Sequence, residues 1–481
     1  MNTITAAART HAVRHARASR ILGMSIAVLA ISGIAFSDSV EQLLAYVIVL
    51  AAASLPSVLW VRLGALGIPV FPALSLAYIP YFAFPMVSGS ENISIYSPWE
   101  VLRSGLTVAM FLVCATIAWR FIVTVRPPKF TFAAVHYSPS QVTRLIVLGL
   151  MLGLLFQLGL IGEWFSWMGS FFGMARTLIN TFTTIACFLS GVAYAQGILR
   201  GTSWRLILIT VVLIIVLCWS SLFLVGGLIF SLALIFGYVI VARRLPWIAV
   251  ALLLGLVFVL HAGKSEVRAK YWEPDTNYGG VSSVTQIPGL AVEWFGQGLR
   301  DIATGEVEQS AFERTSLLQM ILRVQAVTPE FVDYLYGQTY AMLPAIIVPR
   351  FINEDKPTSQ SAMALLNNRY GIQTLEDSAI TAIGWGLVPE AYANFGYLGV
   401  LGIGFVVGGF CGWLAMWGAR AEVVSLPTLY SIAAMMVLIN IEIDFIQVAS
   451  SLFQAFIAVF VFTAIYRWLT YRETSAAVRN S

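Results

Sequence analysis

Long apolar stretches recur along this chain and are separated by short polar or basic segments. Each stretch is about 20 residues long, the length of an α-helix that crosses a hydrocarbon core of about 30 Å. The stretches lack the alternation of apolar and polar positions that membrane β-strands show, so helices are predicted. The pattern predicts about twelve spans. They lie at about 20–37, 40–60, 64–87, 101–123, 142–162, 171–198, 204–220, 222–242, 246–262, 395–418, 427–444 and 446–466.

Two stretches depart from the pattern of one straight helix per span. Residues 206–242 form a single uncharged run that would be roughly 55 Å long as one helix, so a tight turn near Ser220–Ser221 is predicted. The stretch 64–87 is rich in proline, which removes a backbone donor, so this span is predicted to be kinked or broken. Its prolines are Pro69, Pro72, Pro80 and Pro85.

Composition and charge agree with a membrane protein. Apolar types make up 59% of the 481 residues and charged types 11%, against about a quarter charged in soluble domains. The net charge of +4 does not indicate nucleic-acid binding, because most basic residues outside 263–378 lie at span ends on the side of the N-terminus. Arg103 and Arg176 are the exceptions. The positive-inside rule therefore predicts that both termini are cytoplasmic and that 263–378 is extracytoplasmic.

The spans divide the chain into three predicted segments. Residues 1–262 form an N-terminal membrane bundle, 263–378 form one large extracytoplasmic loop, and 379–481 form a C-terminal membrane bundle. The loop is rich in aromatic residues and is therefore predicted to fold. Within it, 311–326 is predicted to be an amphipathic helix. Residues 340–349 are too short to span and too apolar for water, so they dip into the membrane face or pack beneath the loop.

Three short motifs in 335–399 resemble one family, the oligosaccharide repeat-unit polymerases of the Wzy type, which make O-antigens and exopolysaccharides. The motifs are Tyr336-Gly337 with Thr339-Tyr340, then Pro349-Arg350 followed by Lys356-Pro357, and finally Glu390, Tyr392, Asn394, Phe395 and Gly396. The span count and the large outer loop between late spans also match this family.

The resemblance implies a glycosyltransferase of the bacterial cytoplasmic (inner) membrane. Such an enzyme transfers a growing glycan from a polyprenyl pyrophosphate onto the sugar end of a new lipid-linked repeat unit. Its implied partners are the lipid-linked oligosaccharide and membrane lipids, with a chain-length regulator and a flippase as further candidates. Glu273 and Asp275 have the spacing of a metal-binding pair, but Pro274 between them favours a turn. A metal-independent enzyme without a cofactor is therefore expected.

Basic and acidic residues near the motifs suit this chemistry. Arg350 and Lys356, with Arg323 next, are predicted to stabilise the departing pyrophosphate through charge-assisted hydrogen bonds. Glu390 is the leading candidate for the general base that takes the proton of the acceptor hydroxyl. Glu354 and Asp355 are the alternatives.

Further substrate-binding residues follow from the resemblance and from position. They are Tyr336, Tyr340, Tyr392, Asn394 and His261. His261 is the one histidine on the predicted outer side, and it keeps open an O-antigen ligase, a related membrane glycosyltransferase with essential Arg and His.

Purely structural interpretations stand beside these roles. Arg350 and Lys356 can snorkel to the membrane interface, and Arg323 can face solvent on its helix. Glu390 can cap a helix, and His261 can be a polar anchor at a span end. The loop aromatics can belong to the core and to the interfacial belt. A lipid-linked oligosaccharide flippase or transporter, or a non-catalytic assembly subunit, is the rival function of a different class.

Overall fold

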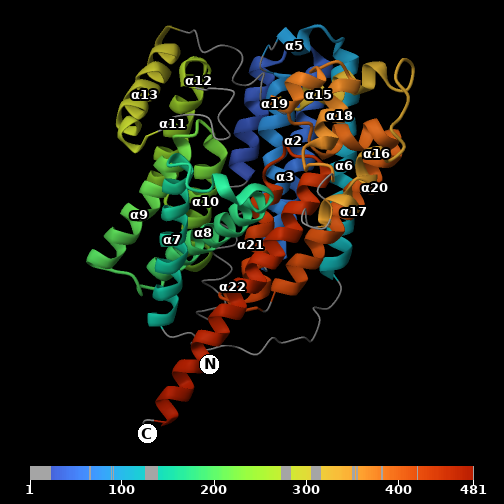
Figure 1. Ribbon diagram of the computed structural model, residues 1–481. Helices are drawn as coiled ribbons and strands as arrows, with labels where there is room; N and C mark the ends of the chain where they lie inside the picture. The colour runs from blue at the N-terminus through green and yellow to red at the C-terminus, as the bar shows by residue number, and fades with distance from the viewer. Residues whose placement is uncertain are drawn as a thin grey trace. The chain divides into compact units, whose positions relative to one another are not determined.

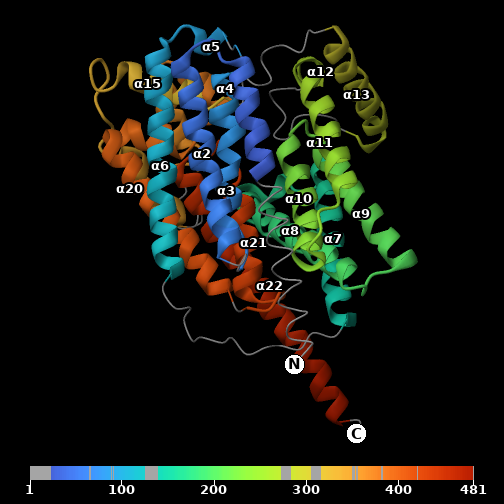
Figure 2. The same cartoon turned by 180° about the vertical axis from the view of Figure 1, so that it is seen from behind.

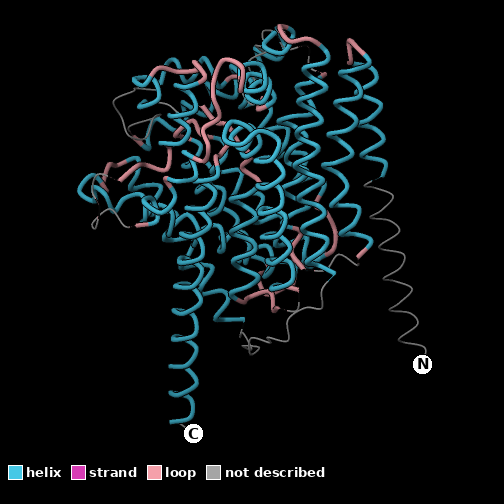
Figure 3. Tube along the Cα trace, turned by 90° about the vertical axis from the view of Figure 1, so that its right-hand side faces the viewer, coloured by secondary structure: helices cyan, strands magenta, loops and turns pink. Residues whose placement is uncertain are grey.

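The structure is a computed structural model that describes residues 23–63, 67–87, 89, 91–124, 139–271, 283–304, 316–348, 353, 356–380, 383–419 and 421–479. Helices are the regular structure throughout these ranges, and no strand occurs among them (Figure 3). The predicted all-α class is confirmed.

Eight of the described helices are long and apolar enough to cross a membrane. A ninth candidate is a broken pair, α11 (Trp247–Ala262) and α12 (Lys264–Tyr271), which are bent by 57°. The chain is thus a multi-pass α-helical membrane protein. The eight helices are α2 (Val40–Arg62), α6 (Pro98–Thr124), α7 (Pro139–Ile161), α8 (Phe172–Ala195), α9 (Gly201–Trp219), α10 (Leu224–Ala242), α20 (Leu387–Gly418) and α22 (Phe445–Arg479).

The remaining predicted spans coincide with shorter apolar helices, at Gly23–Phe36, Val70–Met86 and Leu426–Leu438, the last of which is α21. The predicted turn near Ser220–Ser221 is confirmed, since α9 ends at Trp219 and α10 begins at Leu224.

The chain forms two compact units. Unit 1 comprises Met1–Phe132, Phe312–Glu422 and Val437–Ser450. Unit 2 comprises Ala133–Ala311, Val423–Met436 and Ser451–Ser481. Each unit contains parts of all three predicted segments, because helices that are far apart in the sequence pack together.

In unit 1, α2 packs against both α3 (Val70–Tyr78) and α6 (Figure 2). Helix α6 also packs closely along α20 (Figure 1). Gly404, Gly408 and Gly412 repeat every four residues on α20 and face α6. A Cβ at Gly408 would lie 2.0 Å from the carbonyl oxygen of Ala115. Small residues at this spacing let two helix backbones approach, which is a common basis of helix association in lipid.

The proline-rich span of unit 1 is broken, as its sequence predicts. A π-helical turn, η1 (Ile79–Ala83), lies between α3 and the short α4 (Phe84–Met86). Pro85 has no N–H for the carbonyl oxygen of Tyr81 four residues earlier. That oxygen instead accepts a hydrogen bond of 3.1 Å from the N–H of Leu317. The break therefore anchors a residue of the predicted loop. The short α5 (Glu91–Ser94) precedes α6.

The rest of the predicted loop in unit 1 is made of short helices. The helix predicted at 311–326 begins later, because Ser316 and Leu317 are not helical and 305–315 lie outside the described residues. The observed helix, α15 (Leu318–Val327), exposes only Arg323 and is otherwise largely buried. The others are α16 (Gln338–Ala341), α17 (Leu343–Ile347), α18 (Ser361–Arg369) and α19 (Leu375–Ile380).

The described part of the apolar segment 340–349, residues 340–348, packs against neighbouring helices. Ile346 of α17 forms a buried cluster with Ala362 of α18 and Ile446 of α22. Of the two predicted alternatives, these contacts favour packing beneath the loop over dipping into the membrane face.

In unit 2, α8 and α10 make a close glycine contact. A Cβ at Gly191 would lie 2.1 Å from the carbonyl oxygen of Leu234, and one at Gly237 would lie 2.0 Å from that of Phe188. The short η2 (Ser166–Phe171) leads into α8, and η3 (Val284–Gln286) leads into α13 (Ile287–Thr304).

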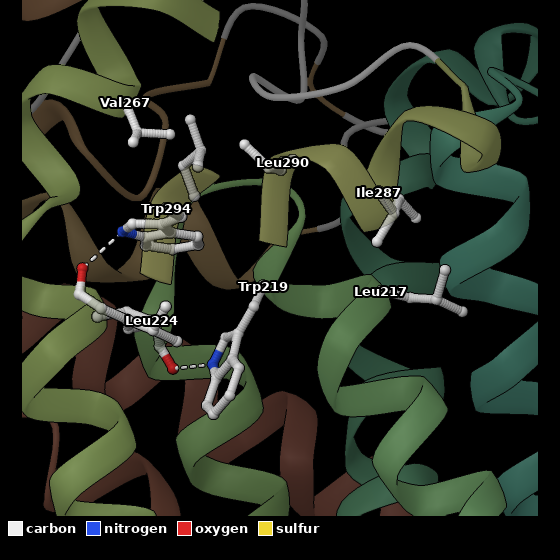
Figure 4. Close-up of a cluster of buried hydrophobic side chains, with 9 residues drawn as sticks. Leu217, Trp219, Leu224, Val267, Ile287, Leu290 and Trp294 are labelled. Atoms are coloured by element: carbon white, nitrogen blue, oxygen red, sulfur yellow. Dashed lines mark hydrogen bonds between the residues drawn. The ribbon is translucent and has the colours of Figure 1, made fainter. Parts of the chain in front are cut away.

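Two tryptophans organise the apolar cluster around α13 (Figure 4). The indole N–H of Trp294 donates to the carbonyl oxygen of Leu260 at 2.6 Å, and that of Trp219 donates to Leu224 at 2.8 Å. Both rings are buried, so each indole donor is satisfied inside the apolar cluster.

Candidate functional site

Helix α20 is interrupted inside unit 1 at Phe395 and Gly396. Their φ and ψ angles are −144° and 18° for Phe395, and 59° and −144° for Gly396. The carbonyl oxygens of Ala393 and Asn394 accept hydrogen bonds from the N–H groups of Leu335 and Tyr336 at 3.0 and 3.1 Å. Residues 335–341, called the docking turn below, thus replace helical hydrogen bonds that the interruption removes.

Asn394 ties the docking turn to α20. Its side chain is fully buried, and its amide donates to Thr339 Oγ1 and to the carbonyl oxygen of Glu390, both at 2.9 Å. Its Oδ1 accepts a hydrogen bond of 3.0 Å from the N–H of Gly337. Two of the three motifs, which lie far apart in the sequence, are therefore joined by one amide.

The docking turn has an unusual backbone. Tyr336 and Gly337 have φ angles of 46° and 89°, both in the left-handed region. Glycine adopts this region freely, whereas a tyrosine there is strained. The Tyr336 ring is 73% exposed, so the strained residue carries an aromatic side chain at the surface.

Glu390 is buried beneath the docking turn together with Asp444. Neither residue has exposed surface. Glu390 Oε2 accepts a hydrogen bond of 2.7 Å from the N–H of Phe445, and Asp444 Oδ1 accepts one of 2.7 Å from that of Gln447. The other carboxyl oxygens, Glu390 Oε1 and Asp444 Oδ2, are buried without a hydrogen-bond partner. Such groups are rare in native proteins and point to a ligand, a proton or a functional role.

Burial changes the acidity of this site. Desolvation raises the pKa of Asp444 to about 6, and N–H donors of the backbone, first that of Gln447, oppose the shift. Tyr340 lies between Phe395 and Phe445, with ring centroids 6.3 and 5.2 Å away. Its hydroxyl is buried without a partner, and desolvation together with the two carboxyl groups raises the pKa of Tyr340.

Tyr336 of the docking turn belongs to a group of four tyrosines. Tyr334 contacts Tyr336 and Tyr392 edge to face, and Tyr392 contacts Tyr397 in the same way. Tyr392 is only 5% exposed, whereas Tyr336 and Tyr397 present large parts of their rings. Of the predicted substrate-binding tyrosines, Tyr336 is therefore at the surface and Tyr392 is a support beneath it.

Of the three predicted phosphate-binding residues, the structure describes Lys356 and Arg323. Each of them donates to backbone carbonyl oxygens near it. Arg350, with Glu354 and Asp355, lies outside the described residues. The Lys356 ammonium donates to the carbonyl oxygens of Ile346 and Val348, both at 2.6 Å, and so caps α17. Arg323 is exposed and donates through Nε to the carbonyl oxygen of Tyr370 at 3.3 Å.

His261 lies in the last turn of α11 in unit 2. Glu273 and Asp275 lie outside the described residues. No group of three or more His, Cys, Asp and Glu suited to a metal ion occurs within the part of the chain that the structure describes.

Sequence reasoning missed Asp444 and Arg103. Asp444 caps a span, and an aspartate directly before an apolar helix is a common N-cap signal. Arg103 donates to the carbonyl oxygen of Gln325 at 2.9 Å, and the Gln325 amide joins Ser104 and Thr107. This network on α15 accounts for one of the two exceptions to the predicted distribution of basic residues.

Comparisons with protein-family models, with curated proteins and with solved structures find no match for this chain.

Proposed function

We propose that this chain is a membrane glycosyltransferase that polymerises oligosaccharide repeat units carried on a polyprenyl pyrophosphate. In this proposal about twelve spans place both termini in the cytoplasm of a bacterium and residues 263–378 outside its cytoplasmic membrane. The product is a surface polysaccharide, an O-antigen or an exopolysaccharide. The observation that carries the proposal is the docking turn on the interrupted helix α20, because it joins two of the three polymerase-like motifs.

The proposed reaction is one displacement at the anomeric carbon of the donor sugar. The acceptor hydroxyl forms the new C–O bond, the bond to pyrophosphate breaks, and the hydroxyl proton passes to a base. Arg350 and Lys356 stabilise the departing pyrophosphate. For Lys356 this requires release of the two carbonyl oxygens that it now binds. Glu390 can take the proton through Oε1 only when the docking turn moves aside, because the carboxyl is fully buried.

Deletion and complementation in a polysaccharide producer test the function. Loss of the gene should leave single lipid-linked repeat units on the outer side of the membrane. Arg350→Ala should not restore polymer, although the protein reaches the membrane, because the pyrophosphate loses a bidentate donor. Arg300→Ala, which removes an exposed arginine of unit 2, is the matched control and should restore normal chain lengths. Normal polymer with Arg350→Ala would overturn the proposed roles.

Tyr336 offers a test of sugar binding that separates the ring from the fold. Tyr336→Gly removes the exposed ring and relieves the positive φ, so the thermal unfolding midpoint should stay equal or rise. If the ring stacks on a sugar, kcat/KM with a lipid-linked repeat unit should fall about 3- to 10-fold. Tyr336→Phe keeps the ring and should retain most activity. Full activity of Tyr336→Gly would remove this residue from the binding surface.

A transporter or flippase of the same substrate is the second candidate. The observation in its favour is the fully buried pair Glu390 and Asp444 at an interrupted apolar helix, since transporters use such carboxylates and breaks for coupling ions. The deletion strain distinguishes the two functions, because loss of a flippase strands the repeat units on the cytoplasmic side. Loss of a ligase would instead leave finished polymer that is not attached to its lipid acceptor.

A further inference from the structure

Two carboxyl groups meet at the N-terminus of α22. The N–H of Phe445, the first residue of this helix, donates to Glu390, and the N–H of Gln447 donates to Asp444. Backbone N–H groups of Ile446 and Met363 also act on Asp444. The free N–H groups and the dipole of a helix N-terminus stabilise negative charge, and the hydrogen bonds from Phe445 and Gln447 each reach one oxygen of a carboxyl group.

Three oxygen atoms of this site have no hydrogen-bond partner: Glu390 Oε1, Asp444 Oδ2 and Tyr340 Oη. Both carboxyl groups interact electrostatically with each other and with Tyr340, so the three groups are neighbours. Two ionised carboxylates offer only acceptors, and the side-chain donors that act on the pair are the neutral hydroxyls of Tyr340 and Thr339. Neither hydroxyl brings a positive charge, Glu390 Oε1 and Asp444 Oδ2 remain without a partner, and like charges buried at one site repel each other.

The groups around the pair do not neutralise it. No described lysine, arginine or histidine is among the groups that act on either carboxyl. Glu442, two residues before Asp444, contacts Gly384 and acts on Tyr81. Below the docking turn, the apolar cluster of Ile346, Ala362 and Ile446 adds no polar side chain.

We propose that Glu390 and Asp444 form one proton-binding site, which holds a single proton between the two carboxyl groups near neutral pH. The protonated carboxyl then donates to the ionised one, and the Tyr340 hydroxyl donates to the pair. All three oxygens thereby gain a partner, and the buried charge falls from two to one. The proposal concerns proton binding alone and does not depend on the glycan chemistry.

The number of oxygens explains why the ligand is a proton. Calcium takes about six to eight oxygen ligands and magnesium about six in a near-octahedral arrangement. The site offers three oxygens without partners, and the carboxyl groups have no exposed surface through which water could complete a metal shell. A proton needs only the two carboxyl oxygens between which it lies.

Loss of this proton at higher pH has a structural consequence. Glu390 lies four residues before Asn394, which holds the docking turn, and Asp444 caps α22. Two charges at this junction repel each other and loosen the contact between the docking turn, α20 and the first turn of α22. The site therefore makes this junction sensitive to pH. When the proton is bound, the docking turn, α20 and the first turn of α22 stay in contact.

Infrared spectroscopy of the full-length protein in lipid nanodiscs tests the proposal. The wild type should show the carbonyl stretch of one protonated, buried carboxyl group at pH 7, and this band should disappear as the pH rises. Asp444→Asn and Glu390→Gln should each lack it, because an amide donor next to the remaining carboxylate removes the need for the proton. Asp301→Asn is the matched control, since Asp301 is a buried aspartate of unit 2 bound by the Gln297 amide. It should keep the band.

Tyr340→Phe gives a second measurement on a variant of nearly unchanged shape. Without the phenol donor the ionised form of the pair is less stable, so the band should persist to higher pH than in the wild type. Three results would overturn the proposal: no band at pH 7, a band unchanged in both carboxyl variants, or a band that appears only in sodium-free buffer. The last result would assign the site to a metal cation.

Discussion

Gly408→Ala should prevent α6 and α20 from packing and should leave little folded protein. The added Cβ would lie 2.0 Å from the carbonyl oxygen of Ala115, and further backbone atoms of Ala115 lie within 2.6 Å. Backbone atoms cannot turn away as a flexible side chain does, so the two helices must separate along their length. Overpacking typically costs about 1–3 kcal/mol, and a clash with rigid backbone falls at the upper end of this range, about 3 kcal/mol or more.

Gly409→Ala is the matched control on the adjacent residue. Its Cβ would meet only Ile122 Cδ1 at 3.7 Å, an ordinary van der Waals distance. This variant should be as stable as the wild type or slightly more stable, because alanine favours helix over glycine by about 1 kcal/mol. Fluorescence-detected size exclusion and the thermal unfolding midpoint in detergent measure both effects. Equal stability of the two variants would mean that α6 and α20 do not approach as described.

Asn394→Leu should separate the docking turn from α20 and abolish polymer formation. The leucine cannot accept the N–H of Gly337 or donate to Thr339 Oγ1, so two groups of the docking turn lose their partner. Each buried group left without a hydrogen bond costs about 1–3 kcal/mol. Under the proposed function, the loss of this geometry should lower the polymerisation rate by at least about tenfold.

Two further variants serve as comparisons for Asn394→Leu. Thr339→Val removes one of the same hydrogen bonds at nearly unchanged volume and should give a smaller loss. Asn368→Leu changes an exposed asparagine of α18 and should leave polymer length and rate unchanged. Polymer length by gel electrophoresis and the amount of protein in the membrane are the measurements. Wild-type polymer with Asn394→Leu would show that the docking turn has no part in the reaction.

The helical architecture could be predicted because it depends on local sequence. A run such as 206–242 must turn back on itself, since a single helix of that length exceeds the membrane thickness. The predicted turn and the observed break between Trp219 and Leu224 agree for this reason. The proline break at Pro85 could also be predicted, because the missing N–H is a property of the residue itself.

The candidate site could be predicted only in part. The motifs around Tyr336 and Asn394 were recognisable, but their direct hydrogen bonds depend on the interruption of α20 at Phe395 and Gly396. The role of Lys356 also depends on its surroundings, because the carbonyl oxygens of Ile346 and Val348 reach its ammonium only when α17 ends beside it.

By itself the sequence determined that the chain is α-helical and membrane-spanning, because hydrophobic length and backbone hydrogen bonding in lipid leave no other arrangement. Only the tertiary structure decided which distant groups meet. Glu390 lies in α20 whereas Asp444 caps α22, and Arg103 reaches α15 from α6. Such meetings depend on how helix faces pack, and packing joins residues whose separation along the chain carries no information about their distance in space.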